Sequence, residues 1–441
     1  MGEMSENVWY PLSSPGASKI PIKSAEGIYL YDRRGKEYMD ANSGLWNVPL
    51  GYRNENIIRK IQEQLDQFCY LNPCEFSSDA ETELAILLKG LLHDEIDKIM
   101  YTCTGSESVE LVIKLIRKYA ALGPTPERNG IAILKHSYHG SYYGSMSCSN
   151  YDGRERQGYG PLLEGIYELE LPFCNCCRVG EVSDSCTTGM KKRLEDELAG
   201  FGEKLAGIIM EPILGSAGVI PLPGWYIDRI LSYAREHDIL VAFDEVATGF
   251  GRTGEMFAYE KYAVKPDLIT MSKGINNGSV PLGAVAVGKK ITERFQEKEE
   301  FIFHLSTQNA NALGCAAGIA TIHELIKDNM KLFGEIKEKS RYFEELFSKE
   351  IGQNHKQIFD FRNCGMMFAI DLMDRNLSER MSMRDLLKLV ELLKKNGVIM
   401  EWSYIENLTS CLVIFLPFIV TKEQIQELVS RIKHSFSRIL I

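Results

Sequence analysis

The sequence predicts an α/β protein, with a mostly parallel central sheet in a large domain and a small α+β domain made from both chain ends. At 441 residues the chain is long enough for two or three domains. Strand-like apolar runs alternate with amphipathic helical patterns through its middle, which is typical of a parallel sheet covered by helices. In the last third this alternation gives way to helices with short strands between them.

Each strand expected in the central sheet is a nearly continuous run of Val, Ile, Leu and Ala, as in strands covered on both faces. These runs lie at 131–135, 206–211, 238–244, 267–272 and 283–288. Helices are expected before, between and after them, at 107–122, 224–238 and 309–327. The middle of the chain therefore predicts the large domain, which we place at 51–325.

The small domain is expected at 326–441, together with the N-terminal segment 1–50. Its helices are predicted near 334–350, 383–396 and 421–437, and its strands near 366–372 and 411–416. Residues 27–40 should form a hairpin that turns at Arg34 and Gly35. Because this hairpin has no core of its own, we expect it to pack on the C-terminal domain.

Charge and hydropathy exclude some classes of partner. The chain has 50 basic and 60 acidic residues and a net charge of -10, which argues against a nucleic-acid or anionic-membrane surface. The first residues lack the apolar core of a signal peptide, and the apolar segment 411–420 is too short to span a bilayer. We therefore expect a cytoplasmic protein.

The cysteines give a weak signal. Most of the eleven are scattered, as expected of small buried side chains in a reducing compartment. Cys174, Cys176, Cys177 and Cys186 form a cluster, but their spacing matches no zinc-ribbon or iron–sulfur pattern and no histidine lies among them. A thiol-rich surface loop is the preferred interpretation, and no metal site is predicted.

Three chemically useful side chains close predicted strands. Glu211, Asp244 and Lys273 each end an apolar run, and ligands of open α/β sheets collect at the carboxyl ends of the strands. Plainer interpretations exist, because a carboxylate there could pair with an arginine or cap a turn. Most lysines are simply solvated.

The residues before the helix at 107–122 could bind a phosphate. Thr104, Gly105 and Ser106 lead directly into this helix, and the free N–H groups and dipole of a helix N-terminus favour an anion. Thr104 and Glu107 could equally form a capping box that needs no ligand.

Tyr138 and His139 follow the strand at 131–135, where a tyrosine could pack in the core or lie flat against a planar ring. A helix N-terminus, an aromatic ring, a buried carboxylate and a lysine together suit one ligand. Pyridoxal phosphate has a phosphate, a planar ring, a ring nitrogen and an aldehyde to match them.

Over nearly its whole length the sequence resembles the class III pyridoxal-phosphate aminotransferases, the ω-aminotransferase group. The most specific agreements are DEVATGFGRTG (244–254), PDLITMSKG (266–274) and PLGAV (281–285). Shorter agreements are GSESVE (105–110), YHG (138–140), EP (211–212) and SGLWNVPLGY (43–52). The resemblance implies fold type I and a homodimer whose active sites lie at the subunit interface.

The resemblance also implies roles for single residues. Lys273 would form the Schiff base with the cofactor and carry a proton during catalysis. Asp244 would bind the pyridine nitrogen, and Glu211 would organise the pocket. Val246 would pack on one face of the ring and Tyr138 on the other.

The phosphate would be held by Gly105 and Ser106, joined by Thr307 from the second subunit, and His139 would belong to the same cofactor-binding group. The implied activity is a ping-pong transfer of an amino group from a primary amine or ω-amino compound to an oxo acid or other carbonyl compound.

Departures from the family pattern concern the substrate. Val413 stands where many members have an arginine that grips a substrate carboxylate, and Leu416 replaces the first proline of the Pro-Pro-Leu that follows it. Asn363 replaces a glycine, and the stretch around Thr307 lacks the family's Gly and His-Pro. Without the bidentate arginine, we expect that the amine donor or acceptor is not a simple 2-oxo dicarboxylate handled in the usual way.

Trp46 would line an apolar substrate pocket, and Arg252 is a candidate carboxylate ligand, although a loop anchor is its preferred role.

Other activities remain open on the same scaffold: an aminomutase, or a transaminase coupled to decarboxylation. Retention of Lys273 and Asp244 argues against a cofactor-binding scaffold without turnover. A metal-dependent role of the cysteine cluster is the last alternative.

Overall fold

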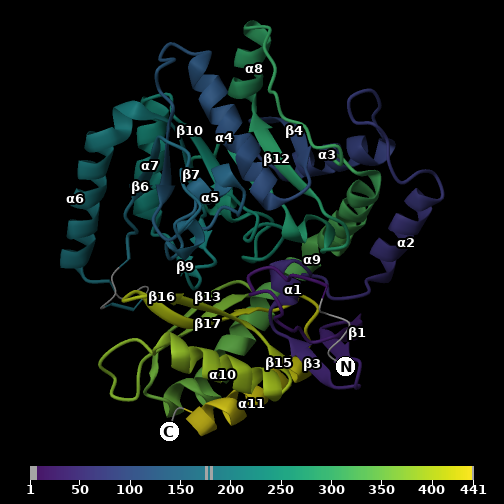
Figure 1. The fold of residues 1–441 in the computed structure, drawn as a ribbon, viewed down its shortest axis with the longest axis vertical. Helices are drawn as coiled ribbons and strands as arrows, with labels where there is room; N and C mark the ends of the chain where they lie inside the picture. Colours follow the sequence, from purple (N-terminus) through teal and green to yellow (C-terminus); the bar gives the residue numbers. More distant parts are fainter. Residues whose placement is uncertain (1–6, 174–176, 179–181, 440–441) are drawn as a thin grey trace.

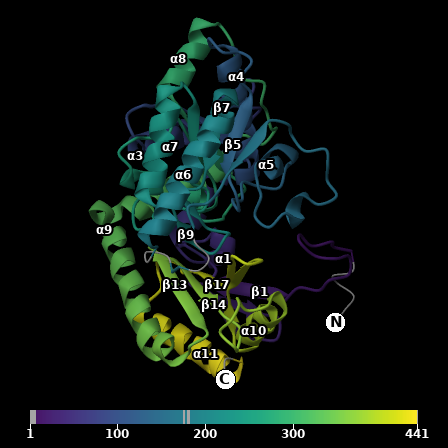
Figure 2. The ribbon, with the colours of Figure 1, turned by 90° about the vertical axis from the view of Figure 1, so that its left-hand side faces the viewer.

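The computed structural model describes residues 7–173, 177–178 and 182–439 and confirms the α/β fold class. In Figure 1 the large central sheet and its helices fill the upper half of the molecule. Elements from both ends of the chain fill the lower half, where the two termini also lie. Figure 2 shows the helix α9 running from the large sheet down along the small domain.

The central sheet has seven strands in the order β4-β12-β11-β10-β7-β5-β6. Their bounds are β4 Ile96–Thr102, β5 Gly130–Leu134, β6 Ile166–Leu169, β7 Leu205–Met210, β10 Leu240–Asp244, β11 Leu268–Met271 and β12 Gly283–Gly288. The neighbours from β11 to β6 pair in parallel, whereas β12 is antiparallel to both β11 and β4. A mostly parallel sheet is therefore confirmed.

Helices cover both faces of this sheet. Their bounds are α2 Glu55–Leu65, α3 Asp79–Leu91, α4 Gly105–Ala121, α5 Tyr143–Ser147, α6 Asp184–Phe201, α7 Gly224–Glu236, α8 Lys289–Glu297 and α9 Ala312–Glu350. The apolar stripe of α4 is buried, including Val109, Val112 and Ile116. The backbone of α9 is non-helical at 327–330, so its two parts match the separate helices expected at 309–327 and 334–350.

The small domain contains a four-stranded antiparallel sheet of order β13-β14-β17-β16. Its strands are β13 Ile358–Cys364, β14 Met367–Leu372, β16 Glu401–Ile405 and β17 Thr409–Phe415, and its helices are α10 Met383–Lys395 and α11 Lys422–Ile439. Phe343, Phe347, Phe361 and Phe368 stack where α9 meets this sheet.

The predicted hairpin is also confirmed: β2 (Tyr29–Asp32) pairs antiparallel with β3 (Glu37–Asp40), and Gly35 in the turn has φ of 81°. With β1 (Ile22–Glu26) and the two-residue β15 (Val398–Ile399), these strands form a separate sheet. Because β15 pairs in parallel with β3, a C-terminal strand completes the N-terminal sheet.

Shorter elements join these layers. They are α1 Ser43–Trp46, β8 Ile213–Leu214, β9 Ile220–Pro221 and the 3₁₀ turns at 154–156, 202–204, 258–261, 273–276 and 352–354. Within the described parts of the chain, no helix is both long and apolar enough to cross a bilayer.

Candidate active site

A cavity of about 170 Å³ lies at the carboxyl ends of the parallel strands. The residues that end or follow β5, β7, β10 and β11 line it, together with the N-terminus of α4. Of the predicted site residues it brings together Trp46, Gly105, Ser106, Tyr138, His139, Glu211, Asp244, Val246 and Lys273. A larger groove lies elsewhere, on an outer face beside α4.

One residue, Ser272, separates Lys273 from the end of β11, and Lys273 has a left-handed backbone, with φ of 45°. Its Nζ lies 4.3 Å from the centre of the Trp46 ring. Burial lowers the pKa of this amine to about 8, although the carboxylates of Asp244 and Glu211 act in the opposite direction. A large fraction of Lys273 can therefore be neutral near pH 8, as a nucleophile or base requires.

Asp244 closes β10 and is only 5% exposed. Its Oδ1 accepts hydrogen bonds from Val246 N at 3.1 Å and Thr270 Oγ1 at 2.9 Å, and its Oδ2 lies 2.7 Å from His139 Nδ1. Burial disfavours the charged carboxylate, but the bonds from His139 and the other donors outweigh it and lower the pKa of Asp244. Asp244 is thus a buried anion at the cavity wall.

His139 supports this anion from the loop after β5. Because a carboxylate only accepts hydrogen bonds, Nδ1 of His139 carries the proton that it shares with Asp244. The backbone N–H of His139 donates to Ser149 Oγ at 2.8 Å, which fixes the position of the residue. The buried Nε2 has no hydrogen-bond partner among the described residues.

Glu211 follows β7 and joins two loops of the cavity. Its Oε1 accepts from the backbone N–H of Tyr138 at 3.0 Å, and its Oε2 accepts from that of Gly215 at 3.1 Å. Burial raises the pKa of Glu211 to about 7, and the nearby Asp244 carboxylate acts in the same direction. Glu211 is therefore able to hold or release a proton near neutral pH.

The N-terminus of α4 forms another side of the cavity. Thr104 caps the helix, since its Oγ1 accepts from Glu107 N at 3.1 Å. A Cβ added to Gly105 would lie 3.0 Å from both methyl carbons of Val246, and one added to Gly140 would lie 2.5 Å from Ser106 Oγ. These glycines keep open the space in front of the helix dipole, where an anion is favoured.

Trp46 enters the cavity from the N-terminal segment, although its side chain is only 7% exposed. Its ring stacks on Phe415 of the small domain, with centroids 4.2 Å apart and an interplanar angle of 9°. Residues 43–46 all have positive φ and form a left-handed turn. This conformation costs about 1–2 kcal/mol for each residue other than glycine, so the surrounding contacts must stabilise it.

Three residues singled out in the sequence lie outside the cavity lining. Arg252 is buried behind Phe415 and Phe418, with Nη1 donating to Leu416 O at 2.7 Å. Burial lowers the pKa of Arg252 to about 9. Val413 belongs to an apolar cluster with Trp46, and Thr307 is exposed on the segment before α9.

Sequence reasoning missed several residues of the site. Ser216 and Ala247 line the cavity, and Thr270 bonds the Asp244 carboxylate. Thr270 could have been found from strand pairing, because it stands opposite Asp244 in the register of β10 and β11. Ser216 carries no sequence pattern beyond its glycine-rich loop.

The donor set fits pyridoxal phosphate, the ligand expected from the sequence. The buried anion Asp244 suits a protonated ring nitrogen, and the N-terminus of α4 suits a phosphate. Lys273 supplies an amine for the aldehyde. In the described parts of the chain no group of three or more His, Cys, Asp or Glu side chains is placed to hold a metal ion; Cys174 and Cys176 lie outside them.

The family model for class III aminotransferases matches residues 12–436. An omega-aminotransferase of Caulobacter vibrioides is 32% identical over 80% of the chain and 81% of its own length. A beta-alanine–pyruvate aminotransferase of Pseudomonas aeruginosa is 32% identical over 83% of each sequence.

Solved structures of transaminases are similar to this chain over nearly its whole length. A transaminase from the marine bacterium Virgibacillus has a TM-score of 0.91 and 26% identity, with 100% of the chain and 98% of that structure covered. A taurine:2-oxoglutarate aminotransferase from Bifidobacterium kashiwanohense, in complex with PLP and glutamate, has a TM-score of 0.88 and 27% identity. The alignment covers 99% of the chain and 96% of that structure.

Proposed function

Because the chain belongs to the class III aminotransferases, which depend on pyridoxal phosphate, we propose that its amino donor is a primary amine or ω-amino compound without a carboxylate beside the reacting carbon. The activity itself is a ping-pong transfer of the amino group to an oxo acid or other carbonyl compound. The proposal concerns the substrate class and the roles of the residues around the cavity.

The roles follow from what each residue can donate, accept or move. Bound pyridoxal phosphate supplies an aldehyde that takes up amino groups and a ring that accepts electrons from the substrate carbon. Lys273 would hold the cofactor through Nζ and, once displaced by the amine, would carry a proton to and from the substrate carbon at that same atom. Its lowered pKa favours this role.

Asp244 would stay ionised and keep a protonated ring nitrogen in place, with His139 orienting its carboxylate. Gly105 and Ser106 would bind the phosphate at the N-terminus of α4. Glu211 would order the loops that carry Tyr138 and Gly215, and Tyr138 and Val246 would pack against the ring.

The observation that supports the substrate class is the chemistry of the cavity wall. Of the described residues that line the cavity, none is an arginine. Trp46 and Ala247 are apolar, and Ser216 is neutral. A carboxylate next to the reacting carbon would therefore lack the bidentate partner that recognises it best. The relatives named for omega-amino compounds, beta-alanine and taurine agree with the proposed donor, whereas the printed acceptor of the taurine enzyme, 2-oxoglutarate, is a 2-oxo dicarboxylate.

A panel of amines and oxo acids tests the proposal. We expect faster transfer from primary amines and ω-amino acids than from α-amino acids, when amino product and carbonyl product are both quantified. Replacement of Lys273 by Ala should abolish the transfer, whereas replacement of the surface residue Lys290 on α8 should not. Strong saturable activity with 2-oxoglutarate that depends on one arginine would contradict the substrate class, and product formed without any added acceptor would favour an aminomutase.

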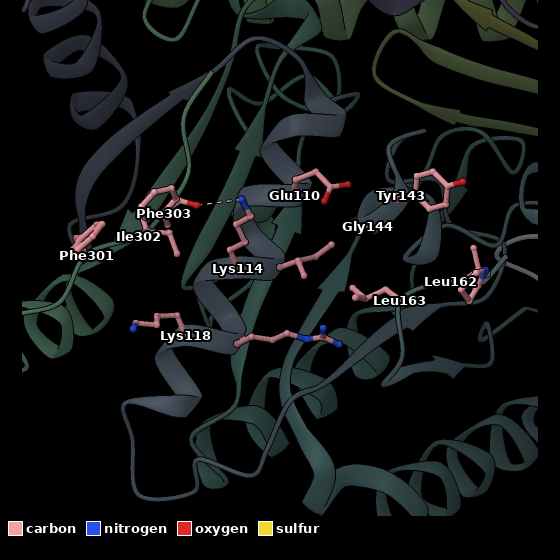
Figure 3. A pocket seen from close by; sticks show the side chains of 13 residues that line it. Glu110, Lys114, Lys118, Tyr143, Gly144, Leu162, Leu163, Phe301, Ile302 and Phe303 are labelled. Atoms are coloured by element: carbon pink, nitrogen blue, oxygen red, sulfur yellow. Dashed lines mark hydrogen bonds between the residues drawn. The ribbon is translucent and has the colours of Figure 1, made fainter. Parts of the chain in front are cut away.

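The proposed working unit is a homodimer. An outer groove of about 790 Å³ lies between α4 and the segments near 143, 161 and 301, as Figure 3 shows. Lys114 Nζ donates to Phe303 O at 3.2 Å across one edge of it. The side chains of Phe301, Phe303 and Leu305 are 68%, 85% and 63% exposed, an apolar stripe that a second copy of the chain would cover.

Thr307 lies just beyond this stripe and is exposed. In a dimer it would be available to the phosphate site of the other subunit, which is the role expected from the sequence.

We further place the enzyme in the cytoplasm. The exposed thiols of Cys69 and Cys74 support this, because such thiols persist in a reducing compartment; the net charge of -10 supports the absence of a nucleic-acid partner.

A further inference from the structure

The turn that carries Trp46 is held in an unusual conformation. Ser43, Gly44, Leu45 and Trp46 have φ of 45°, 57°, 63° and 68°, so the chain makes a left-handed helical turn. Backbone bonds close it, with Trp46 N donating to Asn42 O at 2.7 Å. L-residues avoid this region, so the turn persists only where its surroundings over-determine it.

One carboxylate supplies much of that constraint. Asp40, at the end of β3, is 1% exposed. Its Oδ1 accepts from Asn42 N at 2.9 Å, and its Oδ2 accepts from both Gly44 N and Tyr52 Oη at 2.7 Å. Asp40 thus binds the backbone before and inside the turn and ties both to the chain that follows it.

The turn is also anchored to the small domain. Ser43 Oγ donates to Phe415 O at 2.6 Å, and Phe415 N donates to Ala41 O at 2.8 Å. The Trp46 ring lies on the Phe415 ring, and a Cβ added to Gly215 would lie 3.2 Å from it on the large-domain side. The indole is held between the two domains, over Lys273 Nζ.

We propose that Asp40 is a positioning residue of the active site: by holding the left-handed turn 43–46, its carboxylate sets the Trp46 indole against Lys273 and fixes one wall of the substrate pocket. The inference rests on the proposed function, because this wall affects activity only if the pocket binds the amine substrate. Whether Asp40 positions Trp46 can be measured without any assay of catalytic activity.

An amide cannot replace this carboxylate. The turn offers donors to both oxygens, and an asparagine presents only one oxygen together with an N–H donor. Asp40→Asn therefore leaves the N–H of Gly44 or of Asn42 without an acceptor. Trp46 would then be free to leave its place between Phe415 and Lys273.

The chain provides a matched control in the same N-terminal sheet. Asp32, at the end of β2, is 8% exposed and also organises a turn, since its Oδ1 accepts from Arg34 N at 2.8 Å and Lys36 N at 2.9 Å. Tyr38 Oη donates to its other oxygen at 3.4 Å. Asp32 is not among the residues that line the cavity. Asp32→Asn therefore makes the same acid-to-amide change away from the site, and its single oxygen can still accept from both backbone N–H groups.

The first measurement is fluorescence of the full-length protein. Replacing the tryptophans at 9, 225 and 402 by Phe leaves Trp46 as the only emitter, because the chain has four tryptophans. In this background we expect Asp40→Asn to raise acrylamide quenching of Trp46 several-fold and Asp32→Asn to leave it unchanged. Asp40→Ser, whose hydroxyl can accept from one N–H, serves if the asparagine variant does not fold.

The second measurement is the KM and kcat of the holoenzyme for a primary amine. Asp40→Asn should raise KM by about tenfold, with a smaller change in kcat. In a Trp46→Ala background the same substitution should change KM by less than about twofold, because the residue through which Asp40 acts is gone.

Equal quenching in the two aspartate variants would overturn the proposal, as would multiplicative KM effects of Asp40→Asn and Trp46→Ala. If the quenching rises only in the Asp40 variant but no amine is turned over, the proposed function fails and the positioning of Trp46 stands.

Discussion

Lys273, Glu211 and Asp244 share one cavity, yet their surroundings move their proton affinities in different directions. Burial lowers the pKa of Lys273 to about 8 and raises that of Glu211 to about 7. Asp244 is equally enclosed, but the bonds from His139, Val246 and Thr270 keep it ionised. The site therefore holds one fixed anion beside two groups that exchange protons near neutral pH, which suits proton transfer at a substrate carbon.

The lowered pKa of Lys273 predicts how stability depends on pH. Below about pH 8 the amine is protonated in both the folded and the unfolded chain, so the cost of burying its charge is fully present. Between about pH 8 and the ordinary lysine pKa of 10.5 the unfolded chain binds more protons, and the folded state gains stability as the pH rises. Lys273→Met should therefore stabilise the cofactor-free protein most below pH 8.

Urea unfolding at several pH values measures this. We expect the difference in the free energy of unfolding between Lys273→Met and the parent to be largest near pH 7 and to shrink as the pH approaches 10.5. A difference that is constant with pH, or that grows as the pH rises, would mean that Lys273 is not held in a desolvated site.

At the level of elements, the start of α4 should be the most sensitive point for the cofactor. A Cβ on Gly105 would meet both methyl groups of Val246 at 3.0 Å and must displace them toward the cavity. We expect Gly105→Ala to weaken pyridoxal phosphate binding by about tenfold, which corresponds to about 1.4 kcal/mol, as measured by equilibrium dialysis.

Gly90 of α3 is the matched control, because a Cβ there would meet nothing within 4 Å. Gly90→Ala should leave cofactor binding unchanged and stabilise the helix by about 0.5–1 kcal/mol. Unchanged binding in the Gly105 variant would show that the N-terminus of α4 does not hold the phosphate.

The sequence predicted the elements whose patterns are unambiguous. Central strands such as β7 and β10 are fully buried and nearly all apolar, so they stand out. The edge strands β4 and β6 mix buried and partly exposed positions, and they were not predicted. The reversed direction of β12 also went unpredicted, because apolar composition does not encode strand direction.

The sequence predicted those site residues that end a strand or belong to a motif of the known family. The left-handed turn at 43–46 is held by the nearby Asp40 and by Phe415 and Gly215, which are distant in sequence, and only Gly44 within it gives a local signal. The same holds for Arg252, whose position behind Phe418 is set by tertiary packing. Long-range contacts of this kind leave no periodic pattern in the sequence from which they could be predicted.

At the level of the whole molecule, the N-terminal segment lines part of the cavity that the large domain carries, and the small domain supports that part from behind. Trp46 comes from the N-terminal segment and rests on Phe415 of the small domain, whereas Lys273 follows a central strand. The domain boundaries at 50/51 and 325/326 stay predictions; the second lies close to the break in α9 at 327–330. Movement of the small domain would shift one wall of the pocket against the other.

The proposed dimer predicts the behaviour of its exposed stripe. Phe303→Asp should weaken self-association by about 30-fold or more, because a fully exposed aromatic side chain of this kind is a typical interface anchor. Sedimentation velocity over a concentration series measures the change. Leu387→Asp on α10, where the side chain is 36% exposed in the small domain, should leave association unchanged. A parent protein that is monomeric at all concentrations would contradict the dimer.

The most direct test of the account is reductive trapping of the cofactor. The purified protein is supplied with pyridoxal phosphate, reduced with borohydride, digested and analysed by mass spectrometry. The account predicts one phosphopyridoxyl adduct, on the peptide that contains Lys273, and its loss in Lys273→Ala. An adduct on another lysine, or none at all, would contradict the assignment of this cavity as the catalytic centre.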